Sequence, residues 1–266
     1  MTAAIAAGNR VMVKQAANSQ NLCRLLARKF SEKISMEKIA ILPGTPGKEF
    51  SCLAYDHLIF TGSPQVGKTI MEGASTHLTP VTLELGGKSP TILAEDFDIK
   101  TAVERIMYGK LINSGQTCIA PDYLFVPQDK IDAFIETAKK VVSKRYPTMK
   151  TRDYTNIIDR RAYGRLVDTL EDARAKNADI INLLPGPQTD EPLKKISPTI
   201  VRSVTQDMRI MKEEIFGPLL PVMGYTSMDQ VIEYINARPR PLALTPPYGA
   251  GIRRIYTAVK KFKWLS

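Results

Sequence analysis

Residues 57–69 read HLIFTGSPQVGKT, and this stretch decides the fold. The apolar run His57–Phe60 favours extended backbone, which predicts a strand. A turn follows at residues 61–64, and because proline suits the first position of a helix, we expect a helix to begin near Pro64. A strand that leads through a glycine turn into a helix is the repeating unit of parallel α/β folds.

The rest of the chain shows the same alternation of short β-rich runs and amphipathic helical stretches. Strands are expected at 11–14, 38–42, 81–85, 90–94, 123–126, 179–184, 198–204 and 217–223. Helices are expected after Ser19, after Asp98, and at about 131–142, 159–176 and 228–237. The sequence therefore predicts an α/β protein with parallel strands.

Composition narrows the possible chemistry. The 266 residues include two histidines and three cysteines, and Cys23, Cys52 and Cys118 lie far apart with no metal-binding spacing, so no metal site is expected. No apolar run reaches the ~20 residues that span a bilayer, and no secretory signal is recognisable, so we expect a cytoplasmic protein with no membrane partner.

The net charge is +10, but residues 245–266 carry five basic and no acidic side chains, so half of the excess positive charge lies in one short tail. This distribution favours an ordinary globular body over a nucleic-acid-binding one.

The turn at Gly62–Thr69 can be interpreted in three ways. It matches the P-loop pattern GxxxxGK[ST], in which Lys68 would contact phosphates and Thr69 a magnesium ion. It also suits the pyrophosphate of a dinucleotide, since a helix N-terminus offers unpaired N–H groups and a positive dipole end. The third interpretation is a plain helix start, and the octet alone does not decide among them.

Three further places could carry chemistry. Glu84 stands at the end of an expected strand before two glycines, although a lone acid there is more often a surface residue. Cys118 follows a turn at Gly115, where backbone N–H groups can stabilise a thiolate, although a free cysteine is more often buried and structural. In KEEIFGP, residues 212–218, an acid and an aromatic precede a Gly-Pro turn and could hold a ribose hydroxyl and cover a planar ring; a helix end before a strand is the alternative.

Taken together, these segments resemble the aldehyde dehydrogenase superfamily. The matching stretches are AAGNRVMVK (6–14), FTGSPQVGK (60–68), VTLELGGKSP (81–90), GQTCIAPDY (115–123) and EEIFGP (213–218), in the family's order and spacing. Within the family, HLTPVTLELGGKSP and GQTCIAPDYLFVP are similar to the class 3 type and to bacterial coniferyl aldehyde dehydrogenases. The resemblance covers nearly all of residues 3–244.

The resemblance implies an aldehyde dehydrogenase fold, with a partial Rossmann-type dinucleotide-binding domain at 1–86, a catalytic domain at 87–244 and a divergent basic tail at 245–266. It implies NAD(P)-dependent oxidation of an aldehyde, aromatic like coniferyl aldehyde or medium-chain, to a carboxylic acid through a thiohemiacetal and a thioester. By position, Cys118 matches the catalytic nucleophile and Glu84 the general base. The coenzyme-binding positions are Lys14, Gly62, Ser63, Pro64, Gln65, Val66, Gly67, Glu214 and Phe216.

Other features depart from the family pattern. Family members are nearly twice as long, so the resemblance implies a fragment that lacks N-terminal and C-terminal parts, including the asparagine of the oxyanion hole and strands of the family's homodimer. Ala17 stands where many members have a glutamate that selects NAD, so NAD and NADP both remain possible coenzymes. Two other functions stay open, a P-loop NTPase acting through Gly62–Thr69 and a non-catalytic protein that binds through its basic tail.

Overall fold

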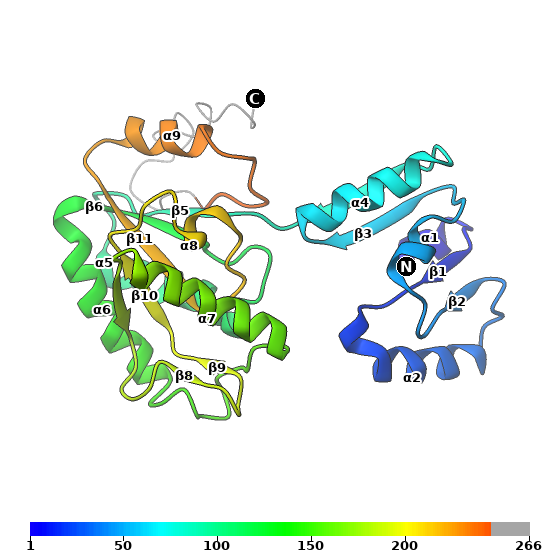
Figure 1. Cartoon of the computed structure of the whole chain (residues 1–266), viewed down its shortest axis with the longest axis horizontal. Coiled ribbons are helices and arrows are strands. Elements are labelled where there is room, and N and C mark those ends of the chain that lie inside the picture. The colour runs from blue at the N-terminus through cyan, green and yellow to red at the C-terminus, as the bar shows by residue number, and fades with distance from the viewer. Residues whose placement is uncertain (246–266) are drawn as a thin grey trace. The chain divides into compact units, whose positions relative to one another are not determined.

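A computed structural model describes residues 1–245, which fall into two compact units. Unit 1 is Met1–Glu84, and unit 2 begins at Leu85. In Figure 1 the colour runs along the chain from blue to cyan through unit 1 and then from cyan through green and yellow to orange along unit 2. The division lies two residues before the domain boundary expected after Gly86, and the expected tail lies outside the described residues from 246 onward.

Unit 1 consists of two strand pairs, each packed against a helix. Its elements are α1 (Thr2–Ala6), β1 (Val11–Val13), the 3-10 helix η1 (Ala17–Ser19), α2 (Gln20–Ser31), β2 (Ile39–Ile41), α3 (Gly47–Ser51), β3 (Leu58–Gly62), α4 (Pro64–Ser75) and β4 (Val81–Leu85). β1 and β2 run parallel and bury Ile39 and Ile41 against Cys23 of α2, so this cysteine has the structural role expected of a buried thiol. β3 pairs with β4 and packs on α4. The predicted strand, turn and helix at residues 57–69 are confirmed.

Unit 2 is built on a five-stranded sheet of order β5-β6-β11-β10-β7. Its elements are β5 (Pro90–Ile92), α5 (Ile99–Leu111), η2 (Ile112–Gly115), β6 (Tyr123–Pro127), η3 (Gln128–Lys130), α6 (Ile131–Arg145), α7 (Arg160–Ala175), β7 (Asp179–Asn182), β8 (Thr189–Asp190), β9 (Lys195–Ile196), β10 (Thr199–Arg202), α8 (Arg209–Lys212), β11 (Leu219–Tyr225) and α9 (Met228–Asn236). β5, β6, β11 and β10 are parallel as expected, with Leu124 opposite Val222 and Ile200 opposite Leu220.

β7 departs from the predicted parallel arrangement, because it runs antiparallel to β10. The chain returns from β7 to β10 through the small β8–β9 hairpin, with no helix between them. A parallel neighbour needs a long crossover connection, whereas an antiparallel one can be reached by a short return, so the connection explains the direction.

Alternating side chains place unit 2's core on both faces of its sheet. Leu124 and Val126 of β6 point toward α5 and α6, whereas Tyr123 and Phe125 point to the other face, toward α9. α7 covers that second face over β10 and β11 (Figure 1). Strands buried on both faces read as continuous apolar runs, as β6 does. Within residues 1–245, no helix has both the length and the apolar character that crossing a lipid bilayer requires.

Candidate functional site

The phosphate-type turn of unit 1 is exposed and precedes a regular helix. Residues 63–66 are exposed, whereas Gly67 on the inner face of α4 is buried. The Ser63 hydroxyl accepts a hydrogen bond from the Val66 N–H at 3.4 Å, and Pro64 occupies the first turn. This capping fixes where α4 begins and leaves its positive dipole end open to solvent, which is the arrangement that binds anions.

Lys14 and Glu84 lie at or just after the ends of strands in the same unit. Lys14 follows β1 directly and is half-buried, and a Cβ added to Gly47 at the start of α3 would lie 3.7 Å from the Lys14 Nζ. The ammonium therefore lies at the carboxyl end of β1, where ligands bind in parallel α/β sheets. Glu84 is exposed near the end of β4. This exposure fits both alternatives for Glu84, an ordinary surface acid and a general base that must reach water.

In unit 2, Cys118 lies in a loop with unusual backbone geometry. Asn113, Ser114 and Gly115 all have positive φ angles, at 52°, 53° and 75°. Left-handed backbone is unfavourable for Asn113 and Ser114, which have a Cβ, and such strain persists only where surrounding contacts enforce it. The loop ends with the Cys118 thiol exposed, not sealed in the core.

Polar side chains supply those enforcing contacts. The Gln116 amide donates to the carbonyls of Asn113 and Asn156 at 2.9 and 3.0 Å and accepts from the Ile158 N–H at 2.9 Å. The Ser114 hydroxyl donates to the Thr155 carbonyl at 2.5 Å. The loop before Cys118 is thereby bound to residues 155–158, so the thiol projects from a rigid support.

The Glu214 and Phe216 segment is anchored through the residue between them. The Ile215 side chain is buried, its N–H donates to Asp122 Oδ1 at 2.8 Å, and its carbonyl accepts from the Arg165 guanidinium at 2.6 Å. Phe216 has a positive φ of 46° and an exposed ring. Fixing Ile215 inward directs both flanking side chains away from the core.

The Cys118 loop and this segment are in direct backbone contact. A Cβ at Gly115 would overlap the Gly217 carbonyl, and one at Gly217 would lie 2.5 Å from Leu166. Only glycine fits at either position without movement of its neighbours. The predicted residues Cys118, Glu214 and Phe216 therefore belong to two adjoining loops.

The Glu214 carboxylate lies against the glycines that follow β4. A Cβ at Gly86 would overlap the carboxylate oxygens, and the Gly87 backbone N–H donates to them. Burial raises the pKa of the Glu214 carboxyl above its ordinary value, and the Gly87 hydrogen bond opposes this shift.

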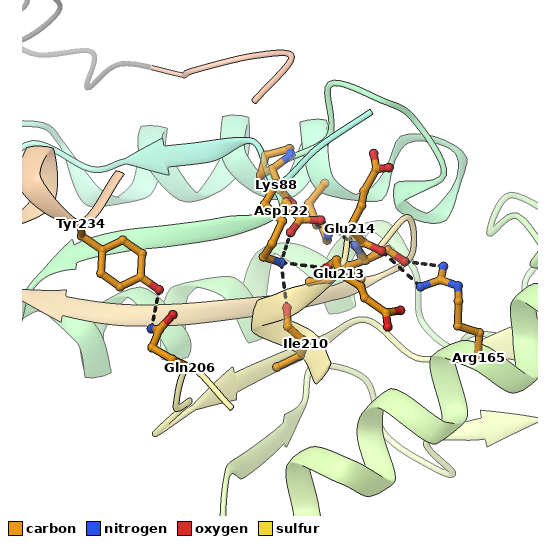
Figure 2. A network of polar contacts seen from close by, with 11 residues as sticks. Lys88, Asp122, Arg165, Gln206, Ile210, Glu213, Glu214 and Tyr234 are labelled. Carbon is orange, nitrogen blue, oxygen red and sulfur yellow. Dashed lines mark hydrogen bonds and ion pairs between the residues drawn. The ribbon is translucent and has the colours of Figure 1, made fainter. Parts of the chain in front are cut away.

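Figure 2 shows an ion pair between Lys88 and Asp122 that ties these segments together. The Lys88 ammonium also donates to the carbonyls of Ile210 at 2.8 Å and Glu213 at 3.0 Å. Asp122 is 3% exposed and the Lys88 side chain is 14% exposed, so most of the pair is shielded from water. The sequence interpretation passed over both residues, although they stand inside the motifs VTLELGGKSP and GQTCIAPDY.

A second lysine beneath the Cys118 loop was also missed. Lys110 of α5 is 1% exposed, and its ammonium donates to the Pro121 carbonyl at 2.8 Å, which links the two ends of the loop. Burial lowers the pKa of Lys110 to about 8, and the neighbouring Asp122 carboxylate opposes this. Its position on the inner face of a helix was the available signal, since lysine is rarely buried without a partner.

The fold and these adjoining motifs are those of an aldehyde dehydrogenase. The sequence profile of the aldehyde dehydrogenase family matches residues 1–245, and the chain belongs to that family. The predicted family and its α/β fold are thereby confirmed.

Individual relatives agree with this assignment. The chain is 45% identical over 244 residues to a probable coniferyl aldehyde dehydrogenase of Caulobacter vibrioides, covering 90% of this chain and 50% of that protein. It is 38% identical to aldehyde dehydrogenase family 3 member A2 of Rattus norvegicus, covering 92% of this chain and 50% of that protein. A substrate-bound structure of Staphylococcus aureus AldH superposes with a TM-score of 0.87 at 37% identity, covering 96% of this chain and 56% of that one. The chain spans about half the length of the curated relatives it matches.

Proposed function

We propose that the protein oxidises an aldehyde to a carboxylic acid with NAD or NADP, using Cys118 as the nucleophile. The observation that carries this proposal is the exposed Cys118 thiol on a strained, fully braced loop that adjoins the Glu214 and Phe216 segment. A family relative named for coniferyl aldehyde supports an aromatic substrate, with medium-chain aldehydes as the alternative. The family likeness also leads us to propose a homodimer.

The residues present fit a dinucleotide coenzyme. The open N-terminus of α4, with Gly62, Ser63, Pro64, Gln65, Val66 and Gly67, offers a phosphate-binding end, and Lys14 offers an ammonium to ribose hydroxyls. Glu214 would accept hydrogen bonds from the nicotinamide ribose, and the exposed ring of Phe216 would cover the nicotinamide. When bound, the coenzyme supplies the hydride acceptor.

The chain's own side chains would carry the other steps. The Cys118 thiolate adds to the aldehyde carbon, so an S–C bond forms and the carbonyl electron pair moves to oxygen, where nearby N–H groups stabilise it. Loss of hydride leaves a thioester on Cys118. Glu84 then takes a proton from water, the resulting hydroxide attacks the thioester carbon, and the thiolate leaves as the acid forms.

A first-turnover assay tests the nucleophile. Mixing the chain with excess aldehyde and NAD or NADP should give a burst of reduced coenzyme, at most one per chain, visible by its near-ultraviolet absorbance. Cys118→Ser should abolish the burst, whereas Cys52→Ser, a half-buried cysteine in unit 1, should keep it. A burst that survives Cys118→Ser would exclude Cys118 as the nucleophile.

The base is tested by separating the two half-reactions. Glu84→Gln should keep the first burst but slow steady turnover by roughly 10²–10⁴-fold, the usual contribution of a general base, and the acyl group should accumulate on Cys118 in mass spectra. Magnesium-dependent ATP binding that Lys68→Ala removes would instead favour the NTPase alternative.

A further inference from the structure

The Lys88–Asp122 ion pair holds the backbone on both sides of Glu214. Lys88 donates to the Glu213 carbonyl at 3.0 Å, and Asp122 accepts from the Ile215 N–H at 2.8 Å. The two peptide groups that flank Glu214 are therefore each bound to one member of the pair (Figure 2).

The same pair also reaches the two other segments of the site. Lys88 directly follows Gly86 and Gly87, the residues on which the Glu214 carboxylate rests. Asp122 directly precedes β6, the strand that follows the Cys118 loop, four residues after the thiol. One ion pair thus joins the segment that receives the carboxylate, the segment that presents it and the loop that carries Cys118.

All three N–H donors of Lys88 and both carboxylate oxygens of Asp122 are engaged in hydrogen bonds. Lys88 has three N–H donors, and they go to Asp122, the Ile210 carbonyl and the Glu213 carbonyl. Asp122 uses one oxygen for Lys88 and the other for Ile215. Such a closed set of bonds in a buried place tolerates little displacement, because any movement leaves a buried polar group unpaired.

We propose that Lys88 and Asp122 are positioning residues that set the Glu214 carboxylate relative to the Cys118 loop. The proposal rests on the proposed function, in which Glu214 contacts the coenzyme. Neither side chain needs to touch substrate or coenzyme, since both act through the peptides beside Glu214.

Asp122→Asn is the direct test, because asparagine keeps the shape and an acceptor for Ile215 while it removes the charge that pairs with Lys88. We expect the amide of Ile215 to exchange with solvent deuterium at least tenfold faster. The coenzyme KM should rise roughly tenfold to a hundredfold, as small misplacements of reacting groups commonly cost, while the Cys118 burst amplitude stays. The matched control is Glu136→Gln, which removes the exposed Lys139–Glu136 ion pair on α6 and should change neither quantity.

A second variant guards against simple loss of folding. Lys88→Met with Asp122→Asn removes both charges of the pair, so thermal stability should recover relative to Asp122→Asn alone. If stability recovers while the coenzyme KM stays raised, the pair positions Glu214. If the KM returns to that of the unsubstituted chain, or Ile215 exchanges no faster in Asp122→Asn, the pair has only a structural role and the proposal is wrong.

The two proposals can fail separately. Amide exchange at Ile215 and alkylation of Cys118 by iodoacetamide need no coenzyme. A chain that gives no burst yet shows faster exchange in Asp122→Asn would contradict the proposed function and leave the positioning role of the pair supported for the backbone of Glu214.

Discussion

The two units bury their apolar side chains in different ways. In unit 1 the buried hydrophobic residues form two separate clusters, Cys23 with Ile39 and Ile41, and Leu58 with Ile70 and Ala74. In unit 2 a continuous five-stranded sheet is covered on both faces, and its largest cluster draws on helices and strands alike. Isolated strand pairs are marginally stable in water, so the units should respond differently to the same kind of change.

The difference also separates two kinds of site. Unit 1 offers an open helix end and an exposed carboxylate at Glu84, which depend on few neighbours. Unit 2 holds Cys118 and Glu214 on loops braced by buried polar bonds. We infer that substitutions in unit 1 act directly, on coenzyme binding at the helix end and on the proposed base at Glu84, whereas substitutions around Cys118 and Glu214 in unit 2 also act through geometry.

The largest contrast is expected from a matched pair of leucine truncations. Leu166 of α7 is fully buried over Gly217, so Leu166→Ala should cost about 2–5 kcal/mol of unfolding free energy. Leu22 of α2 is 51% exposed, and Leu22→Ala should stay within about 0.5 kcal/mol. Urea unfolding followed by circular dichroism, with amide exchange to resolve the units, measures both. Equal losses would mean that the contact of Leu166 with Gly217 contributes no more to stability than an exposed leucine does.

A pair of glycines with the same backbone angle gives the next contrast. Gly44 in unit 1 and Gly115 in unit 2 both have φ near 75°, but a Cβ meets nothing within 4 Å at Gly44 and overlaps the Gly217 carbonyl at Gly115. Gly44→Ala should cost about 1–2 kcal/mol from left-handed strain alone. Gly115→Ala should add about 1–3 kcal/mol, because the backbone must move.

The same pair of variants also tests whether the contact between Gly115 and Gly217 holds the loop that carries the Cys118 thiol. Gly115→Ala should slow alkylation of Cys118 or make it heterogeneous, and Gly44→Ala should leave it unchanged. Equal costs for the two substitutions would show that the contact between the loops can relax without strain.

Regular elements were predictable from the sequence wherever local pattern decides them. The run before Gly62 and the proline after it determined a strand and a helix start, and Asp98 caps α5 as expected through the Thr101 N–H. Ser19 stands at the start of α2 but makes no capping bond, because a 3-10 turn precedes the helix. The direction of β7 could not be predicted, since it depends on a hairpin too short to leave a clear pattern.

The sequence identifies candidate residues of the site, whose roles stay predictions, but it does not identify the residues that support them. Cys118, Glu214 and Phe216 stand in motifs that a resemblance can transfer residue by residue. Lys88 and Asp122 act through long-range bonds to backbone groups at 210, 213 and 215, which no spacing in the sequence reveals. Side chains that contact ligands are recognisable by type, whereas their supports are recognisable only by position in the fold.

The smallest effect concerns pH and Lys110, the less exposed of two buried lysines in unit 2. Unit 1 has no equivalent, since its lysines are exposed or, at Lys14, half-buried. Burial lowers the pKa of Lys110 to about 8 from 10.5, with Asp122 and Glu214 opposing the shift and Lys88 adding to it. Between these values the unfolded chain binds more protons than the folded one, so stability should rise with pH. Below pH 8 both states hold the proton, and this contribution to the slope vanishes.

Comparing the unsubstituted chain with Lys110→Met isolates that contribution. The unsubstituted chain should gain about 1 kcal/mol relative to the variant between pH 8 and 9, before ordinary tyrosines titrate. Urea midpoints at the two pH values measure the gain, and Lys139→Met on the exposed face of α6 should show no difference. If stability changes with pH equally in Lys110→Met and in the unsubstituted chain, Lys110 keeps its proton throughout this pH range. Lys110 would then donate to the Pro121 carbonyl as a cation over the whole range, and the hydrogen bond that links the ends of the Cys118 loop would not depend on pH.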